Sequence, residues 1–483
     1  MPDIAAFLHR PHNEQWHELA AQFWDDLFQE RYGQRARAGV AIRTPRIADA
    51  EKAPFTAVLH KDSPGSGGYG GTSFVVFPSE FGAIFGLVVG TQGLAPDEDI
   101  LTRPGHARRC RAFSRWFNAE AGGSAFAWSK SDPTRIDLTL PEDVKRILQD
   151  WPAAIRAYGS VIYVAARPGD ASADVLGHAF LTLLDLAMAE RGIQPLARWK
   201  GDSDRSSQAL TARVLASPSE DEVLHQVLAR RFVVLQGPPG VGKTRMATRL
   251  LASAFAGRGR SFQFHPSVGY EQFVGGLAPI EANGQFGFRP TAGLLMEAAR
   301  SARECAPEPW LLHLDEINRA DLARVLGEAL MLFEPARPGD ERRAVHLPFD
   351  FGPPWGHELV LPENLFVLGT MNSADRSTAI LDVAVRRRFA FMHLWPDAEA
   401  LAQSSPLAKD AFGRLQALFV DWATDAVLEL MPGQAYFLCA TDAEARVRFR
   451  YELMPLLGSY LQQGLTPGLD EGIDSYLQWL SSR

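Results

Sequence analysis

The sequence predicts an α/β fold with a parallel-sheet core and a C-terminal helical lid, preceded by an α+β domain. Three observations lead to this prediction. Short aliphatic runs alternate with helical patterns in the middle of the chain, this alternation stops after Trp395, and a polar run near residue 200 separates the region from a mixed first part. Alternating strands and helices are typical of a parallel sheet, because each parallel connection requires a crossover.

Length and composition fit a protein of several domains. The chain has 483 residues, and domains average about 150 residues, so two or three domains are expected. A content of 46% hydrophobic and 22% charged residues excludes a disordered or fibrous chain. The three cysteines, Cys110, Cys305 and Cys439, lie too far apart for a disulfide framework or a zinc cluster.

The chain carries no recognisable targeting or membrane signal. Its first residues lack the apolar segment of a signal peptide, and the most apolar stretch, 179–189, is interrupted by Asp185. We therefore predict a cytoplasmic protein that does not contact a membrane. The net charge of −8 arises almost entirely from residues 201–483, which argues against a basic surface covering the whole molecule.

Local patterns divide the chain into four segments. We predict an N-terminal domain over 1–197, a linker over 198–218, an α/β domain over 219–395 and a helical lid over 396–483. Strand-like runs are 74–77, 83–89, 232–235, 311–314 and 365–369. Helical spacing marks 13–29, 105–118, 176–197, 221–230, 244–256, 322–333, 408–427, 444–463 and 470–481.

A glycine-rich loop between an aliphatic run and an amphipathic helix matches the pattern GxxxxGK[ST]. Its predicted nucleotide-binding residues are Gly237, Pro238, Pro239, Gly240, Val241, Gly242, Lys243 and Thr244. The glycines let backbone N–H groups converge on phosphates at the positive end of the following helix. Lys243 is expected to bridge the β- and γ-phosphates, and the Thr244 hydroxyl to hold Mg²⁺.

Two carboxylates follow the aliphatic run that starts at Trp310. Asp315 is expected to support the Mg²⁺ shell, and Glu316 to polarise the attacking water. Alone, an acidic pair after a strand is usually a solvated sheet edge. Together with Lys243, it is the expected second half of a triphosphate site.

A third polar segment follows the run 365–369. Asn372 stands where its side chain could reach the water or the γ-phosphate, and Asp375 is predicted to lie at the nucleotide. Further on come Arg386, Arg387 and Arg388. Such a triplet is normally a solvated charge run, and its functional interpretation is an arginine finger directed at the γ-phosphate of the next subunit.

These elements, in this order and spacing, resemble an AAA+ NTPase of the McrB-like, restriction-associated branch. The segments that carry the resemblance are FHPS at 264–267, YEQF at 270–273, DEINRA at 315–320, MNSADRS at 371–377, GQAYF at 433–437 and YELMPLL at 451–457. The resemblance covers roughly residues 220–465 and does not reach residues 1–200.

The resemblance implies a homo-hexameric ring that binds nucleotide between subunits, so that Arg387 or a neighbour completes the adjacent site. It also implies Mg²⁺, ATP or GTP, with ATP slightly favoured, and a separate McrC-type nuclease subunit. The chain itself carries no coherent nuclease motif, so any cleavage belongs to a partner. In the McrB-like branch, the N-terminal domain commonly recognises the target.

The first domain offers one candidate DNA surface, an arginine-rich segment over 103–117. Its predicted phosphate-contacting residues are Arg103, Arg108, Arg109 and Arg111. The favoured alternative is a helix whose Phe113, Trp116 and Phe117 face the core while the arginines are solvated, because these aromatics have i, i+3, i+4 spacing. Core packing is likewise favoured over a base pocket for the tryptophans of this domain.

Three functions from different classes remain open at this point. The first is the motor subunit of a nucleic-acid-directed restriction or antiviral defence complex. The second is a MoxR-like remodelling chaperone whose first domain grips protein. The third is a nucleotide-gated assembly switch.

Overall fold

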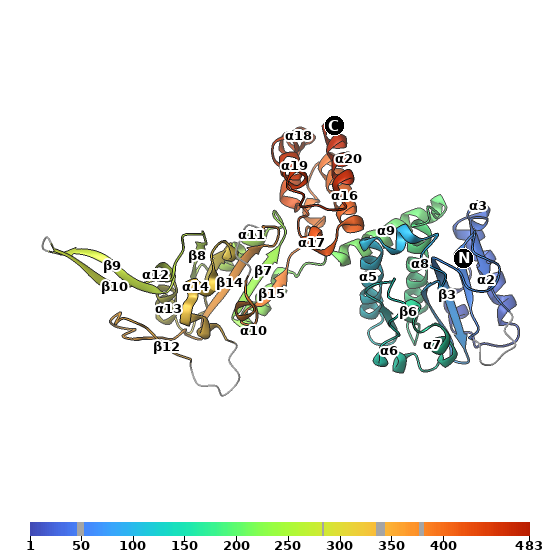
Figure 1. Ribbon diagram of the computed structural model, residues 1–483, viewed down its shortest axis with the longest axis horizontal. Helices are drawn as coiled ribbons and strands as arrows, with labels where there is room; N and C mark the ends of the chain where they lie inside the picture. Colours follow the sequence, from blue (N-terminus) through green and yellow to red (C-terminus); the bar gives the residue numbers. More distant parts are fainter. Residues whose placement is uncertain (46–52, 283–284, 335–342, 376–380) are drawn as a thin grey trace. The chain divides into compact units, whose positions relative to one another are not determined.

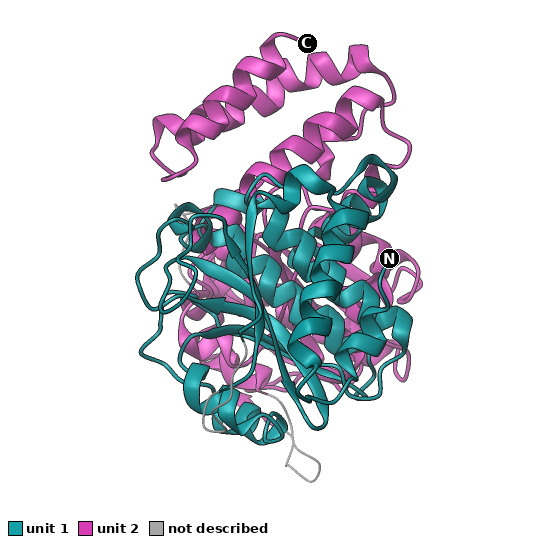
Figure 2. Cartoon of the chain, turned by 90° about the vertical axis from the view of Figure 1, so that its right-hand side faces the viewer, with its two compact units in different colours: residues 1–214, 420–424 teal, residues 215–419, 425–483 magenta. Residues whose placement is uncertain are grey.

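The computed structural model describes residues 1–45, 53–282, 285–375 without 335–342, and 381–483 (Figure 1). Contacts divide the chain into two compact units, coloured separately in Figure 2. The first comprises 1–214 and 420–424, and the second comprises 215–419 and 425–483.

The N-terminal unit contains a six-stranded antiparallel sheet with strand order β1-β2-β3-β4-β6-β5. The strands are β1 (Val40–Arg43), β2 (Thr56–His60), β3 (Thr72–Ser79), β4 (Gly82–Val89), β5 (Phe126–Ser129) and β6 (Ile162–Arg167). Both faces of the sheet are buried: Phe74 and Val76 belong to one core, and Val75 and Phe77 to the other. The predicted α+β class of this region is confirmed.

Helices cover both faces of this sheet. The helices are α1 (Ile4–Leu8), α2 (Trp16–Arg31), α3 (Gln34–Arg37), α4 (Glu98–Leu101), α5 (Pro104–Glu120), α6 (Glu142–Ile147), α7 (Pro152–Tyr158), α8 (Ala173–Ala189) and α9 (Ala197–Val214). Helices α2, α5 and α8 contribute to the larger core, and α6 and α7 to the smaller one. Most of the segment 198–218, predicted as a linker, is helical and forms α9.

The second unit is built on a five-stranded parallel sheet with strand order β15-β7-β14-β11-β8. The strands are β7 (Phe232–Gly237), β8 (Gly259–Gln263), β11 (Trp310–Asp315), β14 (Leu365–Asn372) and β15 (Ala390–His393). Successive parallel strands end at the same edge. In the β7–β14 pairing Gly237 is opposite Asn372, and in the β11–β14 pairing Leu314 is opposite Gly369.

Helices on both faces complete this α/β core. They are α10 (Glu220–Arg230), α11 (Lys243–Ala252), α12 (Tyr270–Phe273), α13 (Leu294–Glu304), α14 (Leu322–Leu326) and α15 (Val383–Arg386). The single helix predicted over 322–333 is interrupted: α14 ends before Gly327, whose φ is 51°, and the 3₁₀ helix η2 (Gly327–Phe333) follows. Glycine adopts this left-handed conformation without the penalty of a Cβ atom.

A two-stranded hairpin, β9 (Gly275–Ala282) and β10 (Gln285–Ala292), extends away from the parallel sheet (Figure 1). Its strands pair Phe286 with Glu281 and Phe288 with Pro279, and both phenylalanines are exposed. The sequence interpretation did not include this hairpin. A second short pair, β12 (Val345–His346) and β13 (Glu358–Leu359), was also missed.

The C-terminal lid is helical, as predicted. It contains α16 (Pro406–Trp422), α17 (Asp425–Leu428), α18 (Asp442–Arg448), a π-helical turn (Phe449–Leu453), α19 (Met454–Gln462) and α20 (Asp470–Ser481). Within the described ranges, no helix is both long and apolar enough to cross a membrane.

Candidate nucleotide-binding site

The phosphate-binding loop connects β7 to α11 at the carboxyl edge of the parallel sheet. Gly240 and Gly242 have φ values of 78° and 92°, in the region that favours glycine. A Cβ atom on Gly240 would approach the Tyr436 ring to 2.9 Å. Both positions therefore require glycine for their left-handed backbone, and Gly240 also requires it because the lid residue Tyr436 packs so close.

Lys243 begins α11 and folds back over its own loop. Its ammonium Nζ donates to the carbonyl oxygens of Gly237 (2.8 Å) and Pro238 (2.7 Å). Burial lowers the pKa of Lys243 to about 8, against the opposing charges of Glu316 and Asp315. The group remains mainly protonated at pH 7, and a phosphate anion beside it would favour the charged form further.

Asp315 is the last residue of β11, and its carboxylate contacts Thr244 at the end of the phosphate-binding loop. Its Oδ1 atom accepts a hydrogen bond from the Thr244 hydroxyl at 2.8 Å and another from the Thr370 hydroxyl. A hydroxyl and a carboxylate fit Mg²⁺, which takes few protein oxygens and completes its shell with phosphate and water. Within the part of the chain that the structure describes, no group of three or more His, Cys, Asp or Glu side chains forms an alternative metal site.

Glu316 adopts a left-handed backbone conformation directly after β11, with a φ of 54°. Its N–H donates to the Thr370 hydroxyl at 3.2 Å, and its Oε2 atom lies 3.7 Å from Nε of Arg319. Burial raises the pKa of Glu316, opposed by Arg319 and reinforced by the charges of Asp315 and Asp375. A carboxylate with a raised pKa at a polar edge is suited to general-base chemistry near neutral pH.

Asn372 ends β14, where its main chain is in register with Gly237. Its Oδ1 atom accepts from the N–H of Ala374 at 3.2 Å, and its carbonyl accepts from Nδ2 of Asn318 at 3.1 Å. The structure thus brings together Lys243, Thr244, Asp315, Glu316 and Asn372, as the sequence predicted. Arg376 and Ser377 of the MNSADRS segment lie outside the described residues.

Comparison with known proteins agrees with this geometry. Residues 232–389 match the model of the AAA domain, dynein-related subfamily. The chain carries an AAA domain of the dynein-related subfamily. This match confirms the predicted AAA+ core, and the relatives described next confirm the McrB-like resemblance.

Two curated relatives are restriction-enzyme components. The chain is 36% identical over 202 residues to the type IV methyl-directed restriction enzyme EcoKMcrB subunit of Escherichia coli (strain K12), covering 41% of this chain and 42% of that protein. It is 26% identical over 196 residues to the type II restriction enzyme BsuMI component YdiS of Bacillus subtilis (strain 168), and this match covers 33% of this chain and 56% of that protein. The chain spans about half the length of these relatives.

The three consecutive arginines of the AAA domain have different environments. Arg387 is 64% exposed and donates to Oε1 of Glu334 at 2.8 Å. Arg388 is 8% exposed, donates to the same oxygen at 2.7 Å and also donates to the Ala384 carbonyl. Arg386 is exposed and packs against the Phe391 ring. Arg388 is therefore buried and held by hydrogen bonds within its own subunit, whereas the side chains of Arg386 and Arg387 are exposed to solvent.

The GQAYF segment of the lid contacts the phosphate-binding loop through hydrogen bonds. The N–H groups of Gly433 and Ala435 donate to the carbonyls of Pro239 (2.8 Å) and Gly240 (3.0 Å). The Gln434 amide donates to the Val241 carbonyl at 2.9 Å. With the two contacts of Lys243, these bonds occupy all five consecutive carbonyls of 237–241. The lid motif is thus an integral part of the site.

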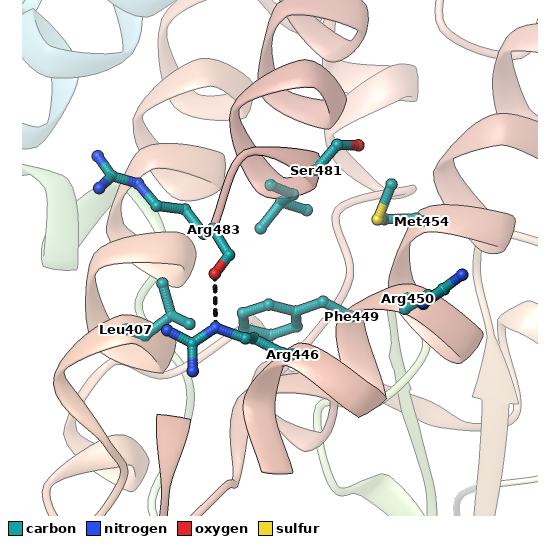
Figure 3. Close-up of a pocket in the computed structure, with 8 residues that line it drawn as sticks. Leu407, Arg446, Phe449, Arg450, Met454, Ser481 and Arg483 are labelled. Carbon is teal, nitrogen blue, oxygen red and sulfur yellow. Dashed lines mark hydrogen bonds between the residues drawn. The ribbon is translucent and has the colours of Figure 1, made fainter. Parts of the chain in front are cut away.

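Three lid arginines have distinct roles in packing. Arg448 donates to the carbonyls of Ala435 (3.2 Å) and Leu438 (2.9 Å), which supports the GQAYF segment. Arg446 donates to the carbonyl of Arg483 beside a cavity of about 440 Å³, and Arg450 lines the same cavity (Figure 3). No residue of the phosphate-binding loop lines this cavity, so it is separate from the nucleotide site.

In the N-terminal unit, the arginine-rich segment forms α5, and Phe113, Trp116 and Phe117 are buried in the larger core. This confirms core packing of the aromatics. Arg108 is also buried, so its side chain is removed from the predicted DNA-contacting set. The remaining predicted side chains, those of Arg103, Arg109 and Arg111, are half-buried, and Arg115 is exposed on the same helix.

Sequence reasoning missed three residues that the structure places at or near the site. Thr370 contacts both acidic residues, Gln434 contacts the phosphate-binding loop, and Glu334 holds two arginines. Gln434 lies inside the GQAYF motif, and Thr370 lies between the run 365–369 and the MNSADRS motif, so neither residue had an assigned role. Glu334 had no sequence signal, because its partners lie more than fifty positions away.

Proposed function

We propose that the chain is an AAA+ NTPase that hydrolyses ATP or GTP and acts as the motor subunit of an McrBC-like restriction or antiviral defence complex. The observation that carries this proposal is the meeting of Lys243, Thr244, Asp315 and Glu316 at one edge of the parallel sheet. These residues supply a cation for the phosphates, oxygens for a metal ion and a base for water.

Each residue has a defined task in this proposal. The backbone N–H groups of the loop and the N-terminus of α11 bind the β- and γ-phosphates, and Lys243 exchanges its two carbonyl partners for phosphate oxygens. Thr244 and Asp315 hold Mg²⁺, which neutralises charge on the phosphates when it is bound. Glu316 accepts a proton from the attacking water, and Asn372 orients that water.

Completion of the site requires a second copy of the chain. Arg387 is the best candidate for a finger, because it is exposed and adjacent to the buried, anchored Arg388. A guanidinium from the next subunit would stabilise charge that develops on the γ-phosphate. Head-to-tail contacts of this kind close into rings, and a homo-hexamer is the proposed assembly.

The proposed setting is supported by the printed names of both relatives, which are components of restriction enzymes. This favours a restriction complex over a MoxR-like chaperone or an assembly switch. In that setting the N-terminal unit recognises DNA, a separate McrC-like subunit cleaves it, and the complex works in the cytoplasm. The exposed part of α5 around Arg111 is the proposed DNA-contacting surface.

The deciding experiment measures hydrolysis of ATP and GTP side by side, with and without DNA. Wild-type protein is expected to hydrolyse at least one nucleotide in the presence of Mg²⁺. Lys243→Ala, which removes the ammonium from the loop, serves as the inactive control. Equal phosphate release by wild type and Lys243→Ala would refute the proposed function, as would failure of the wild type to bind either triphosphate.

A further inference from the structure

We propose that Thr370 is a positioning residue that fixes the Asp315–Glu316 pair for hydrolysis. Thr370 lies on β14, the strand between β7 and β11, two residues before the end of the strand. The inference rests on the proposed NTPase function and adds a residue to which neither the motif pattern nor the comparisons assign a role.

The Thr370 hydroxyl connects two consecutive residues of the neighbouring strand end. Its proton is donated to Oδ1 of Asp315, and its oxygen accepts the backbone N–H of Glu316 at 3.2 Å. The side chain is 1% exposed, so both bonds form away from bulk water. A hydroxyl can donate and accept at once, and this position uses both capacities.

The contact to Glu316 falls at a strained point of the backbone. Glu316 has a φ of 54°, in the left-handed region that non-glycine residues rarely adopt because of their Cβ atom. Such a conformation persists only where surrounding contacts hold it. By accepting the N–H of Glu316, Thr370 fixes the peptide that determines where the Glu316 carboxylate points.

The contact to Asp315 places a second hydroxyl on a proposed metal-ligating oxygen. Oδ1 of Asp315 accepts from Thr244 at 2.8 Å as well as from Thr370. Thr244 would hold Mg²⁺ through its hydroxyl oxygen, whereas the buried Thr370 hydroxyl would stay on Asp315 with or without the metal. Thr370 thereby keeps the Asp315 carboxylate oriented in both states, as outer hydrogen bonds generally orient metal ligands.

The test compares Thr370→Val with Thr370→Ser in the full-length chain. Valine keeps the shape and removes both hydrogen bonds, whereas serine keeps both and removes a methyl group. We expect Thr370→Val to lower kcat at least about 10-fold, while triphosphate affinity without metal stays near that of the wild type. We also expect Thr370→Val to require more Mg²⁺ for half-maximal nucleotide binding, and Thr370→Ser to restore both quantities to within about threefold.

A double-mutant comparison separates positioning from general damage. If Thr370 acts through Glu316, then Thr370→Val adds little further loss of turnover in a Glu316→Gln background. Wild-type turnover and Mg²⁺ dependence in Thr370→Val would overturn this inference while leaving the NTPase proposal intact. Loss of metal-free nucleotide binding in both Thr370 variants would also overturn it, because the hydroxyl would then only maintain the fold. Absence of hydrolysis by the wild type would instead refute the proposed function.

Discussion

The two units contain charged side chains that are used in opposite ways. In the N-terminal unit, Asp185 is buried within α8 and is saturated by neighbours: Nε of Arg31 donates at 2.7 Å and the Tyr32 hydroxyl at 2.5 Å. In the second unit, Glu316 lies half-buried at a strand end, and its Oε2 atom has no hydrogen-bond partner. A satisfied buried charge maintains structure, whereas a carboxylate oxygen that accepts no hydrogen bond and lies 3.7 Å from Arg319 is available for chemistry.

The different sheet types explain this contrast. In the antiparallel sheet of the N-terminal unit, neighbouring strands point in opposite directions and both faces are buried. In the parallel sheet, β7, β11 and β14 all end at one edge, which gathers the polar residues after three distant strands. The charged residues of the second unit can therefore be interpreted as a site, and those near Asp185 as a structural network.

The largest expected effect comes from Glu316→Gln, which removes the proposed base while keeping the shape of the side chain. We expect hydrolysis to fall about 10²- to 10⁴-fold, with triphosphate binding retained and the assembled ring stabilised by bound nucleotide. Phosphate release and nucleotide titration check the two parts separately. Glu297→Gln on α13 is a matched control that should hydrolyse normally. Undiminished hydrolysis in Glu316→Gln would show that the base is another group.

The reverse behaviour is expected for Asp185→Ala. This change leaves Arg31 buried without its carboxylate, and breaking a buried ion pair costs about 3 to 5 kcal/mol. We expect the unfolding free energy of the N-terminal unit to fall by this amount, measured by denaturant titration, while nucleotide affinity remains unchanged. Asp174→Ala, on the exposed first turn of the same helix, should cost less than about 1 kcal/mol. A stable Asp185→Ala protein with lost nucleotide binding would contradict the division of roles.

A mixing experiment tests whether the site is shared between copies. Arg387→Ala subunits lack the proposed finger and Lys243→Ala subunits lack the phosphate-binding cation, so each pure protein should be inactive. In the proposed ring, a mixture of the two proteins gives some interfaces that pair an intact loop with an intact finger. We expect an equimolar mixture to recover roughly a quarter of wild-type turnover, the random fraction of such interfaces. If no ratio restores hydrolysis, then Arg387 does not serve a neighbouring site.

The sequence predicted which residues lie at the carboxyl edge of the parallel sheet, because the signals for them are local. The spacing around Lys243 and the acidic pair after an aliphatic run identified two strand ends, and the topology of a parallel sheet then required them to meet. The alternation of aliphatic runs with helices likewise gave the correct fold class.

Long-range partners and local interruptions could not be predicted in this way. Glu334 finds Arg387 and Arg388 only after the chain has folded, and the hydrogen bonds of Thr370 cross to another strand. The break at Gly327 depends on a backbone angle that helical spacing does not report. The polar composition of 198–218 resembled a linker, although its residues form a largely exposed helix.

The smallest expected effect concerns the N-terminal unit. Arg111 and Arg115 both lie on α5, where Arg111 is half-buried and Arg115 is exposed. If this surface contacts DNA, each arginine contributes about one unit to the slope of log affinity against log salt concentration. We expect Arg111→Ala combined with Arg115→Ala to weaken DNA binding about three- to tenfold at low salt and to reduce that slope by about two units. Arg156→Ala, an exposed arginine on α7, is the matched control. Unchanged affinity and slope in the double variant would remove this face of α5 from the DNA-binding proposal. That result would leave the proposed function of the AAA domain intact, because none of the nucleotide-site residues lies in the N-terminal unit.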